Sequence, residues 1–290
     1  MTDATYVAEA LKLVRLGPLM ATSTGIPEIG IGLVDGPVAA DHPNLAGANI
    51  RVVGDDDGRV PAGADAAAHG TFVAGILVAR RGSLAPAICP GCTLFVRPIF
   101  EELDANGVGM TANIRAIADA IVECVDAGAR IVNLSAATGE PTMRVMHELR
   151  HALDHVTRRG AIVVAAAGNQ ATLGSSEITR HPGVIPVVAY DLSGQPMRQS
   201  NYGRSAGRWG LGAPGDMIVS LVPGRPSARQ AGTSFATAFV AGTLALLWSC
   251  YPTADAAKLR RALLFGHRRT AVVPPLMDAE NAWRALAHAL

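Results

Sequence analysis

The segment Ile29-Gly30-Ile31-Gly32-Leu33-Val34-Asp35 gives the first indication of the fold, because it joins an uncharged apolar run to a carboxylate. Six residues without a charge or a polar side chain are typical of a strand buried on both faces, as in a parallel sheet covered by helices. The carboxylate that ends this run must be paired if it is buried in its ionised form. In open parallel sheets the ligand crevice lies beyond the carboxyl ends of the strands, so polar residues at such positions are the first candidates for chemistry.

Apolar runs alternate with segments of helical periodicity along most of the 290-residue chain. This alternation predicts an α/β fold, a three-layer sandwich with a mostly parallel central sheet flanked by helices. We see no internal repeat, linker or break in composition, so we expect a single domain over 1–290, with 1–28 as an N-terminal helical cover and 254–290 as C-terminal helices. The expected strands are 29–34, 50–53, 93–99, 130–134, 161–166 and 184–189, and the expected helices are 6–16, 69–79, 111–127, 142–158, 233–250, 254–264 and 278–288.

The charge balance argues against a polyanionic partner. Lys and Arg number 25 and Asp and Glu number 24, so the chain has no strong field to attract nucleic acid or an anionic membrane surface. The first 20 residues contain Asp3 and Glu9 and lack the apolar core of a secretory signal, and no stretch is expected to span a bilayer. Four cysteines do not suggest a disulfide scaffold. We therefore expect a cytoplasmic protein, and the sequence leaves its oligomeric state open.

Three residues in suitable settings offer the parts of a nucleophilic site. Ser234 lies in Gly-Thr-Ser-Phe-Ala (232–236), at the expected start of a helix whose first amides favour negative charge. His69 opens the expected helix 69–79, and Asp35 ends the first strand. A hydroxyl nucleophile needs a base, and the base needs an acceptor that holds its tautomer. Each residue alone has an ordinary structural alternative, as a helix cap, a turn residue or an ion-pair partner.

Together these segments resemble the motifs of the subtilase family, whose catalytic Asp, His and Ser follow one another in this order along the chain. The resemblance covers residues from about Ile29 to Trp248. It implies a serine endopeptidase in which Asp35 orients, His69 is the general base and Ser234 is the nucleophile. It also implies that Asn169, in Ala-Ala-Ala-Gly-Asn (165–169), supplies the side-chain donor of the oxyanion hole.

The resemblance further implies where a peptide substrate pairs with the enzyme as an added strand. By position, one pairing segment is Gly107-Val108-Gly109 and the other contains Ser135, Ala136 and Ala137, with Gly168 close by. Glu177 follows the oxyanion segment, and we hypothesise that it faces the pocket for the side chain before the cut bond and favours basic residues there. An ordinary loop or strand end remains the alternative for each of these positions.

Several features narrow the resemblance to the cyanobactin-maturation peptidases of the PatA/PatG type, subtilases that process ribosomally made precursor peptides. The carrying segments are Val-Asp-Gly-Pro-Val (34–38), Asp-His-Pro-Asn-Leu (41–45) and Cys-Pro-Gly-Cys (89–92). Macrocyclising members carry a helical insertion between the catalytic Asp and His, whereas only 33 residues separate Asp35 from His69. We therefore expect hydrolysis. A peptide transpeptidase or macrocyclase on the same triad, and a non-catalytic peptide-binding pseudopeptidase, remain the alternatives.

The sequence departs from the family at three places. Ala238 stands where the family usually has a proline, so a small helix kink is not expected. The loop 80–83 is too short for the calcium loop of secreted subtilisins. The 28 residues before Ile29 are fewer than an inhibitory propeptide needs, so we expect specificity or partners to restrain activity.

Two further motifs suggest metal or redox chemistry. His147-Glu148-Leu149-Arg150-His151 fits the zincin pattern, and His155 extends the row by one turn. We interpret it as a surface helix, since the glycine spacing of metzincins is missing, and a zinc peptidase would be indifferent to Ser234→Ala. Cys89 and Cys92 are interpreted as partly buried thiols or a local disulfide rather than half a zinc site, because four ligands are needed. We expect neither a resident metal nor a cofactor.

Overall fold

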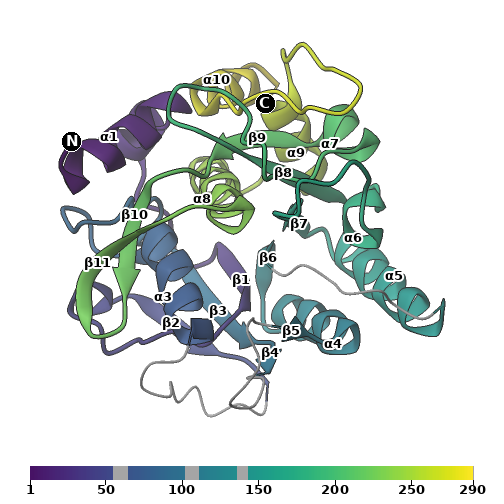
Figure 1. Ribbon diagram of the computed structural model, residues 1–290, viewed down its shortest axis with the longest axis horizontal. Coiled ribbons are helices and arrows are strands. Elements are labelled where there is room, and N and C mark those ends of the chain that lie inside the picture. Colours follow the sequence, from purple (N-terminus) through teal and green to yellow (C-terminus); the bar gives the residue numbers. More distant parts are fainter. Residues whose placement is uncertain (55–64, 102–110, 136–142, 290) are drawn as a thin grey trace.

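A seven-stranded parallel sheet forms the centre of the protein (Figure 1). The computed structural model describes residues 1–54, 65–101, 111–135 and 143–289. The order of the strands is β2-β3-β1-β6-β7-β8-β9, and every neighbouring pair is parallel. The strands are β1 (Gly30–Asp35), β2 (Asn49–Val52), β3 (Thr93–Pro98), β6 (Ala129–Leu134), β7 (Ile162–Ala166), β8 (Val184–Tyr190) and β9 (Leu211–Pro214).

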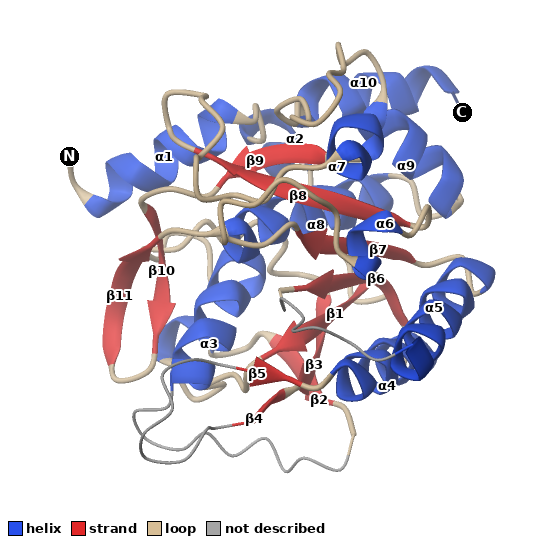
Figure 2. Ribbon diagram, turned by 45° about the vertical axis from the view of Figure 1, so that its right-hand side comes forward, coloured by secondary structure: helices blue, strands red, loops and turns tan. Residues whose placement is uncertain are grey.

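Helices cover both faces of this sheet, which gives the three layers expected from the sequence (Figure 2). On one face lie α3 (Asp65–Val78) and α8 (Thr233–Cys250), and on the other lie α4 (Ile114–Asp126) and α5 (Met143–Arg158). Successive strand residues point to opposite faces. Accordingly Val164 packs in the cluster that contains α3 and α8, whereas its neighbour Val163 packs in the cluster that contains α4 and α5. The continuous apolar strands are thus explained by burial on both sides.

The N-terminal segment packs next to the last helix of the chain (Figure 1). Of the N-terminal helices α1 (Asp3–Leu13) and α2 (Gly17–Thr22), α2 contacts α10 (Ala279–Ala289). Between α1 and α2, the Arg15 guanidinium donates to the Asp278 carboxylate at 2.8 Å. Leu19 and Leu286 belong to the same hydrophobic cluster as the sheet, as does Leu263 of α9 (Ala256–Leu264). The single-domain interpretation stays a prediction that this shared core supports.

The smaller elements were not anticipated. They are the hairpin β10 (Ile218–Val222) and β11 (Arg225–Gln230), the hairpin β4 (Phe100–Glu101) and β5 (Thr111–Ala112), the short helices α6 (Glu177–Arg180) and α7 (Arg204–Trp209), and the 3-10 turn Pro43–Leu45. The expected helix 111–127 was wrong at its start, because residues 111 and 112 pair with β4 and Asn113 then caps α4. The first helix runs over Asp3–Leu13 instead of 6–16, since Thr2 caps its N-terminus.

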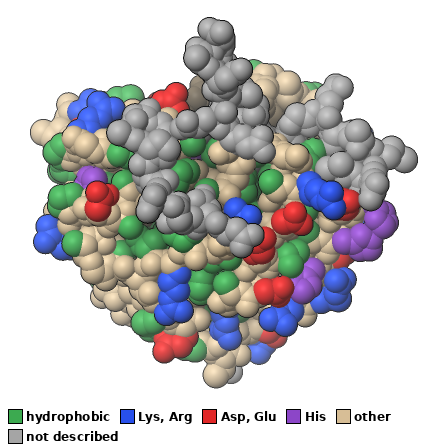
Figure 3. Space-filling view, turned by 90° about the horizontal axis from the view of Figure 1, so that it is seen from below, with side chains coloured by type: hydrophobic (Ala, Val, Ile, Leu, Met, Phe, Trp, Pro, Cys, Tyr) green, Lys and Arg blue, Asp and Glu red, His purple; other side chains and the backbone are tan. Residues whose placement is uncertain are grey.

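The expectation that no stretch is long and apolar enough to span a bilayer was also wrong, because α8 passes that test by length and composition. It is the only described helix to do so. Buried side chains make up 89% of the helix, which packs on the sheet and on α3. Such burial is typical of the central helix of a globular core. On the face seen in Figure 3, acidic and basic side chains are interspersed over the described surface.

Candidate active site

Asp35 ends the central strand β1 and is completely buried. Its Oδ1 accepts a hydrogen bond from the backbone N–H of Gly36 at 2.6 Å and lies 2.6 Å from Nδ1 of His69. An ionised carboxylate can only accept, so Nδ1 of His69 donates and Nε2 is left free to take a proton. Asp35 Oδ2 is buried without a hydrogen-bond partner among the described residues. The arrangement fixes the imidazole tautomer that a general base requires.

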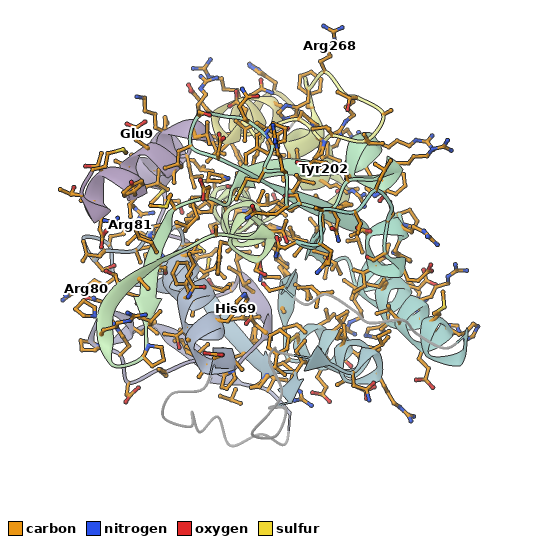
Figure 4. The ribbon with its side chains drawn as sticks, in the orientation of Figure 1. Glu9, His69, Arg80, Arg81, Tyr202 and Arg268 are labelled. Carbon is orange, nitrogen blue, oxygen red and sulfur yellow. The ribbon has the colours of Figure 1, made fainter. Side chains whose placement is uncertain are left out.

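His69 projects from α3 toward the end of β1 (Figure 4). The expectation that it opens its helix was wrong, since the described part of α3 begins at Asp65 and His69 lies in the second turn. Burial lowers the pKa of His69, but the charge and hydrogen bond of Asp35 outweigh it and raise the pKa above its ordinary value. A carboxylate bonded to Nδ1 in this way stabilises the imidazolium, the form that a general base acquires during attack.

Aromatic rings surround the His69 imidazole. The Phe235 ring lies 5.4 Å from it between centroids, and the Phe100 ring meets it edge to face at 6.2 Å. Phe72, one turn after His69 on α3, packs on Phe235 at 4.5 Å. Because Phe235 directly follows Ser234, this packing holds the start of α8 beside His69.

Ser234 is the second residue of α8 and is 7% exposed. Its Oγ donates a hydrogen bond of 3.2 Å to the carbonyl oxygen of Ser135, at the end of β6. No hydrogen bond between the described residues joins Ser234 to His69. Catalytic hydrogen bonds are often long or misdirected in a free enzyme and form in the complex with substrate. In the free protein the Ser234 hydroxyl is directed to the Ser135 carbonyl instead.

Asn169 lies after β7, opposite the start of α8. Its side-chain Oδ1 accepts a hydrogen bond of 3.0 Å from the backbone N–H of Thr233. The Thr233 hydroxyl in turn accepts from the backbone N–H of Gly168 at 3.2 Å. Since Oδ1 is occupied, the amide Nδ2 is the group that Asn169 presents to solvent, where the side chain is exposed. A donor at this point, next to the first amides of α8, suits an oxygen that gains negative charge.

The substrate-pairing segments are described only in part. Ser135 is buried, and its Oγ accepts a hydrogen bond of 2.9 Å from the side-chain amide of Asn133. Its carbonyl oxygen holds the Ser234 hydroxyl, so the end of β6 does meet the nucleophile. The predicted residues Gly107, Val108, Gly109, Ala136 and Ala137 lie outside the described residues.

Glu177 has a partner within its own short helix. It begins α6, and its carboxylate accepts a hydrogen bond of 2.6 Å from Arg180 on the same helix. Both side chains line a cavity between α5 and α6 whose lining also includes Arg150 and His181 and contains no triad residue. The charge of Glu177 is thus paired within its own helix, and its part in selecting a basic side chain stays a prediction.

The three histidines of the zincin-like motif on α5 do not share one partner. The His147 and His151 rings meet edge to face at 4.2 Å on α5, but His155 turns to Asp126, at 3.1 Å from its carboxylate. Among the described residues no three His, Cys, Asp or Glu side chains are grouped as metal ligands.

Cys89 and Cys92 are free thiols. The expectation of partly buried thiols or a local disulfide was wrong, because both thiols are fully buried and no disulfide joins them. The hydrogen bond to Cys92, together with burial, raises the pKa of Cys89. The Cys92 sulfur also lies 3.9 Å from the Ser249 hydroxyl. They form an internal contact between the loop after α3 and the end of α8.

Sequence reasoning missed three supports of the site. The aromatic neighbours Phe100 and Phe235 have no spacing signal relative to His69, although Phe235 is adjacent to Ser234. Asn201, which braces the Asn169 segment, lies 32 residues further along the chain, and only the topology brings the two together.

Comparisons of sequence relate this chain to known peptidases. The subtilase family profile, Peptidase S8, matches residues 27–272. The thermophilic serine proteinase of Bacillus sp. (strain AK1) is 34% identical over 226 residues, which cover 76% of this chain and 52% of that protein. Fervidolysin of Fervidobacterium pennivorans is 28% identical over 259 residues, or 80% of this chain and 36% of that protein. The chain thus spans about half the length, or less, of these two curated relatives.

Comparisons with solved structures also find proteases that share this fold. A mutant of the protease domain of PatA has a TM-score of 0.81 and 30% identity, covering 92% of this chain and 98% of that domain. The prenylagaramide maturation protease PagA has a TM-score of 0.80 and 27% identity, covering 93% and 98%. The nisin leader peptidase NisP of Lactococcus lactis, at 21% identity and a TM-score of 0.78 over 97% and 94%, shares the fold.

Proposed function

Because the chain belongs to the subtilase family, we propose that it is a serine endopeptidase that hydrolyses peptide bonds through an acyl-enzyme on Ser234. The observation that carries the proposal is the buried contact of 2.6 Å between His69 Nδ1 and Asp35 Oδ1, beside the first turn of α8, which contains Ser234. A surface His–Asp pair would be ordinary. Here Asp35 ends a fully buried strand. Its contact with Nδ1 leaves Nε2 as the only ring nitrogen of His69 able to accept a proton.

Acylation follows from this geometry. When the Ser234 hydroxyl turns from the Ser135 carbonyl, it can give its proton to His69 Nε2 while Oγ bonds to the substrate carbonyl carbon. Asp35 stabilises the imidazolium that forms without taking the proton itself. His69 then returns the proton to the leaving amine, and the peptide C–N bond breaks.

The developing oxyanion would be held by two donors, the Asn169 Nδ2 and the backbone N–H of Ser234. Deacylation repeats the cycle with water: His69 takes a proton from the water, whose oxygen attacks the acyl carbon, and Ser234 recovers its proton. Water is proposed as the acceptor in place of a peptide amine because the segment between Asp35 and His69 is short.

We propose that the substrate is a ribosomally made precursor peptide, cut at a defined place. The support is the likeness, at 27–30% identity, to PatA and PagA, which are maturation proteases by name. A macrocyclase on the same triad is the second candidate within the family. The cytoplasmic location stays a prediction from composition.

A fluorophosphonate probe tests the proposal without knowledge of the substrate. We expect covalent labelling that maps by mass spectrometry to Ser234 and disappears in Ser234→Ala. The matched control is Ser193→Ala, which removes an exposed hydroxyl bonded to Asp191 and should label as the wild type does. Unlabelled wild-type protein that is folded would instead support a peptide-binding pseudopeptidase.

Product analysis then separates hydrolysis from aminolysis. Candidate precursor peptides incubated with the enzyme should yield linear fragments that carry one added water across each cut bond. Cyclic products that lack that water would support the macrocyclase.

A further inference from the structure

Asn201 holds the segment that carries the oxyanion donor. Its side-chain Oδ1 accepts hydrogen bonds from the backbone N–H groups of Gln170 at 2.9 Å and Thr172 at 3.2 Å. Its Nδ2 donates to Oε1 of Gln170 at 2.6 Å, and its own backbone N–H donates to the carbonyl oxygen of Gly168 at 2.9 Å. Asn201 therefore bonds to the residues on both sides of Asn169.

The backbone of this segment has positive φ angles at two residues, Gly168 and Ala171. Gly168 has φ +101°, and a Cβ atom there would lie 2.4 Å from the Asn201 Nδ2. Ala171 has φ 54°, a left-handed conformation that is uncommon for a residue with a side chain. Oδ1 of Asn201 bonds to the two N–H groups on either side of Ala171, which are those of Gln170 and Thr172. A side chain that satisfies both N–H groups at once stabilises this turn.

Asn169 is thus fixed between two supports. On one side the Thr233 N–H holds its Oδ1, and on the other Asn201 holds the backbone before and after it. Rotation of the Asn169 amide is limited by the first contact, and displacement of its backbone is limited by the second. The direction of Nδ2 depends on both.

Asn201 itself is well anchored. The preceding Ser200 is fully buried, and its Oγ accepts a hydrogen bond of 3.2 Å from the backbone N–H of Ala189 on β8. The following Tyr202, labelled in Figure 4, pairs with Leu173 in an isolated parallel bridge. Asn201 is only partly buried, so its removal takes little apolar surface from the core.

We propose that Asn201 is a positioning residue for the oxyanion donor: it acts on the reaction only by holding Asn169 Nδ2 where the charge develops. This inference rests on the proposed function of Ser234 and Asn169. A small displacement of a catalytic donor is enough to lose much of its effect, because the geometry of a preorganised dipole is what stabilises the transition state.

The test measures how fast a fluorophosphonate probe inactivates the enzyme, as kinact and KI. In this reaction the Ser234 oxygen bonds to phosphorus, the P–F bond breaks, fluoride leaves and His69 takes the serine proton. The phosphoryl oxygen occupies the oxyanion position. We expect Asn201→Ala to lower kinact by about ten- to a hundredfold with KI unchanged. Asn201→Asp, which keeps an acceptor for both N–H groups, should restore most of the rate.

Two controls separate positioning from a general structural role. Asn281→Ala removes another partly buried asparagine that bonds to backbone, here to the Phe265 carbonyl at 3.1 Å, and should leave kinact unchanged. In an Asn169→Ala background, Asn201→Ala should cause no further loss, because the donor that it positions is gone.

The possible outcomes are distinct. An unchanged kinact in Asn201→Ala, or an equal loss in the presence and absence of the Asn169 side chain, would overturn the inference. Absence of labelling in the wild type would overturn the proposed function and the inference together. Circular dichroism establishes that each variant is folded. If Asn201→Ala does not fold, the decision rests on Asn201→Ser, whose hydroxyl is too short to reach both N–H groups and for which we expect the same loss.

Discussion

A Cβ atom at Gly70 would lie 2.3 Å from the carbonyl oxygen of Gly36, so α3 packs directly on the backbone that follows β1. The reverse contact is as close, since a Cβ atom at Gly36 would lie 1.9 Å from the carbonyl oxygen of Ala66. These two glycines flank the catalytic candidates, each directly following Asp35 or His69. The close backbone contact is what allows the carboxylate to reach the imidazole.

Gly70→Ala should therefore misplace His69. The added methyl meets backbone rather than a flexible side chain, so α3 must shift, at a cost of about 1–3 kcal/mol in the free energy of unfolding. We expect probe inactivation to slow by about a hundredfold, more than the loss of stability explains. Urea denaturation and kinact are the measurements. Gly17→Ala is the matched control, because no atom lies within 4 Å of a Cβ placed there, and a wild-type rate in Gly70→Ala would contradict the argument.

The pH dependence of inactivation should report His69. Burial lowers the pKa of His69, but the charge and hydrogen bond of Asp35 raise it by more, so that the pKa lies above the ordinary 6.5. The protonated imidazole cannot accept the Ser234 proton, so kinact/KI should be lost as the pH falls through this pKa. The acid limb of a plot of kinact/KI against pH is expected to have its midpoint above 6.5. A midpoint below that value would show that burial dominates.

Asp35→Asn should move that midpoint in the other direction. The substitution removes the charge that raises the pKa of His69 and keeps the burial that lowers it. The acid limb should therefore shift to lower pH. The maximal rate should fall by about 10⁴-fold, as in another Ser-His-Asp enzyme whose aspartate was changed to asparagine, because the wrong tautomer is then held. An unshifted limb at a reduced rate would show that another group titrates.

The four cysteines should react in a fixed order with iodoacetamide. Cys250 is partly exposed, whereas Cys89, Cys92 and Cys124 are buried. Burial also raises the pKa of Cys124 to about 12, which leaves very little thiolate. Mass spectrometry of the native protein should find Cys250 modified first, and the other three only when urea is added. Early modification of Cys89 would mean that the loop after α3 opens in the native state.

The sheet was predictable because its strands are continuous apolar runs. The six expected strands are present, each within one residue of its expected bounds at either end. The seventh, β9, was missed because its four residues include Gly212 and Pro214, which normally argue against a strand. Its pairing with β8 is a tertiary effect, since it completes the edge of a sheet that already exists.

Of the candidate site, the sequence indicated the residues that act but not those that support them. Asp35 and His69 were expected to meet, and the structure joins them. The placement of Glu177 could not be foreseen, because its partner Arg180 depends on a four-residue helix capped by Ser176. The hydrogen bonds of Asn201 to the Asn169 segment could not be foreseen either, since they depend on how two loops from different strands lie together.

The elements that contain Asp35 and Ser234 are among the most deeply buried parts of the molecule. Every residue of β1 is buried, and so are the residues of α8 from Thr233 through Trp248. Amides in such elements exchange their hydrogens only when most of the structure opens. No small local fluctuation can then dismantle Asp35 and Ser234 while the remainder stays folded. Heat inactivation and global unfolding should accordingly proceed at one rate, so that an enzyme activity half-life directly measures the kinetic stability of the whole core.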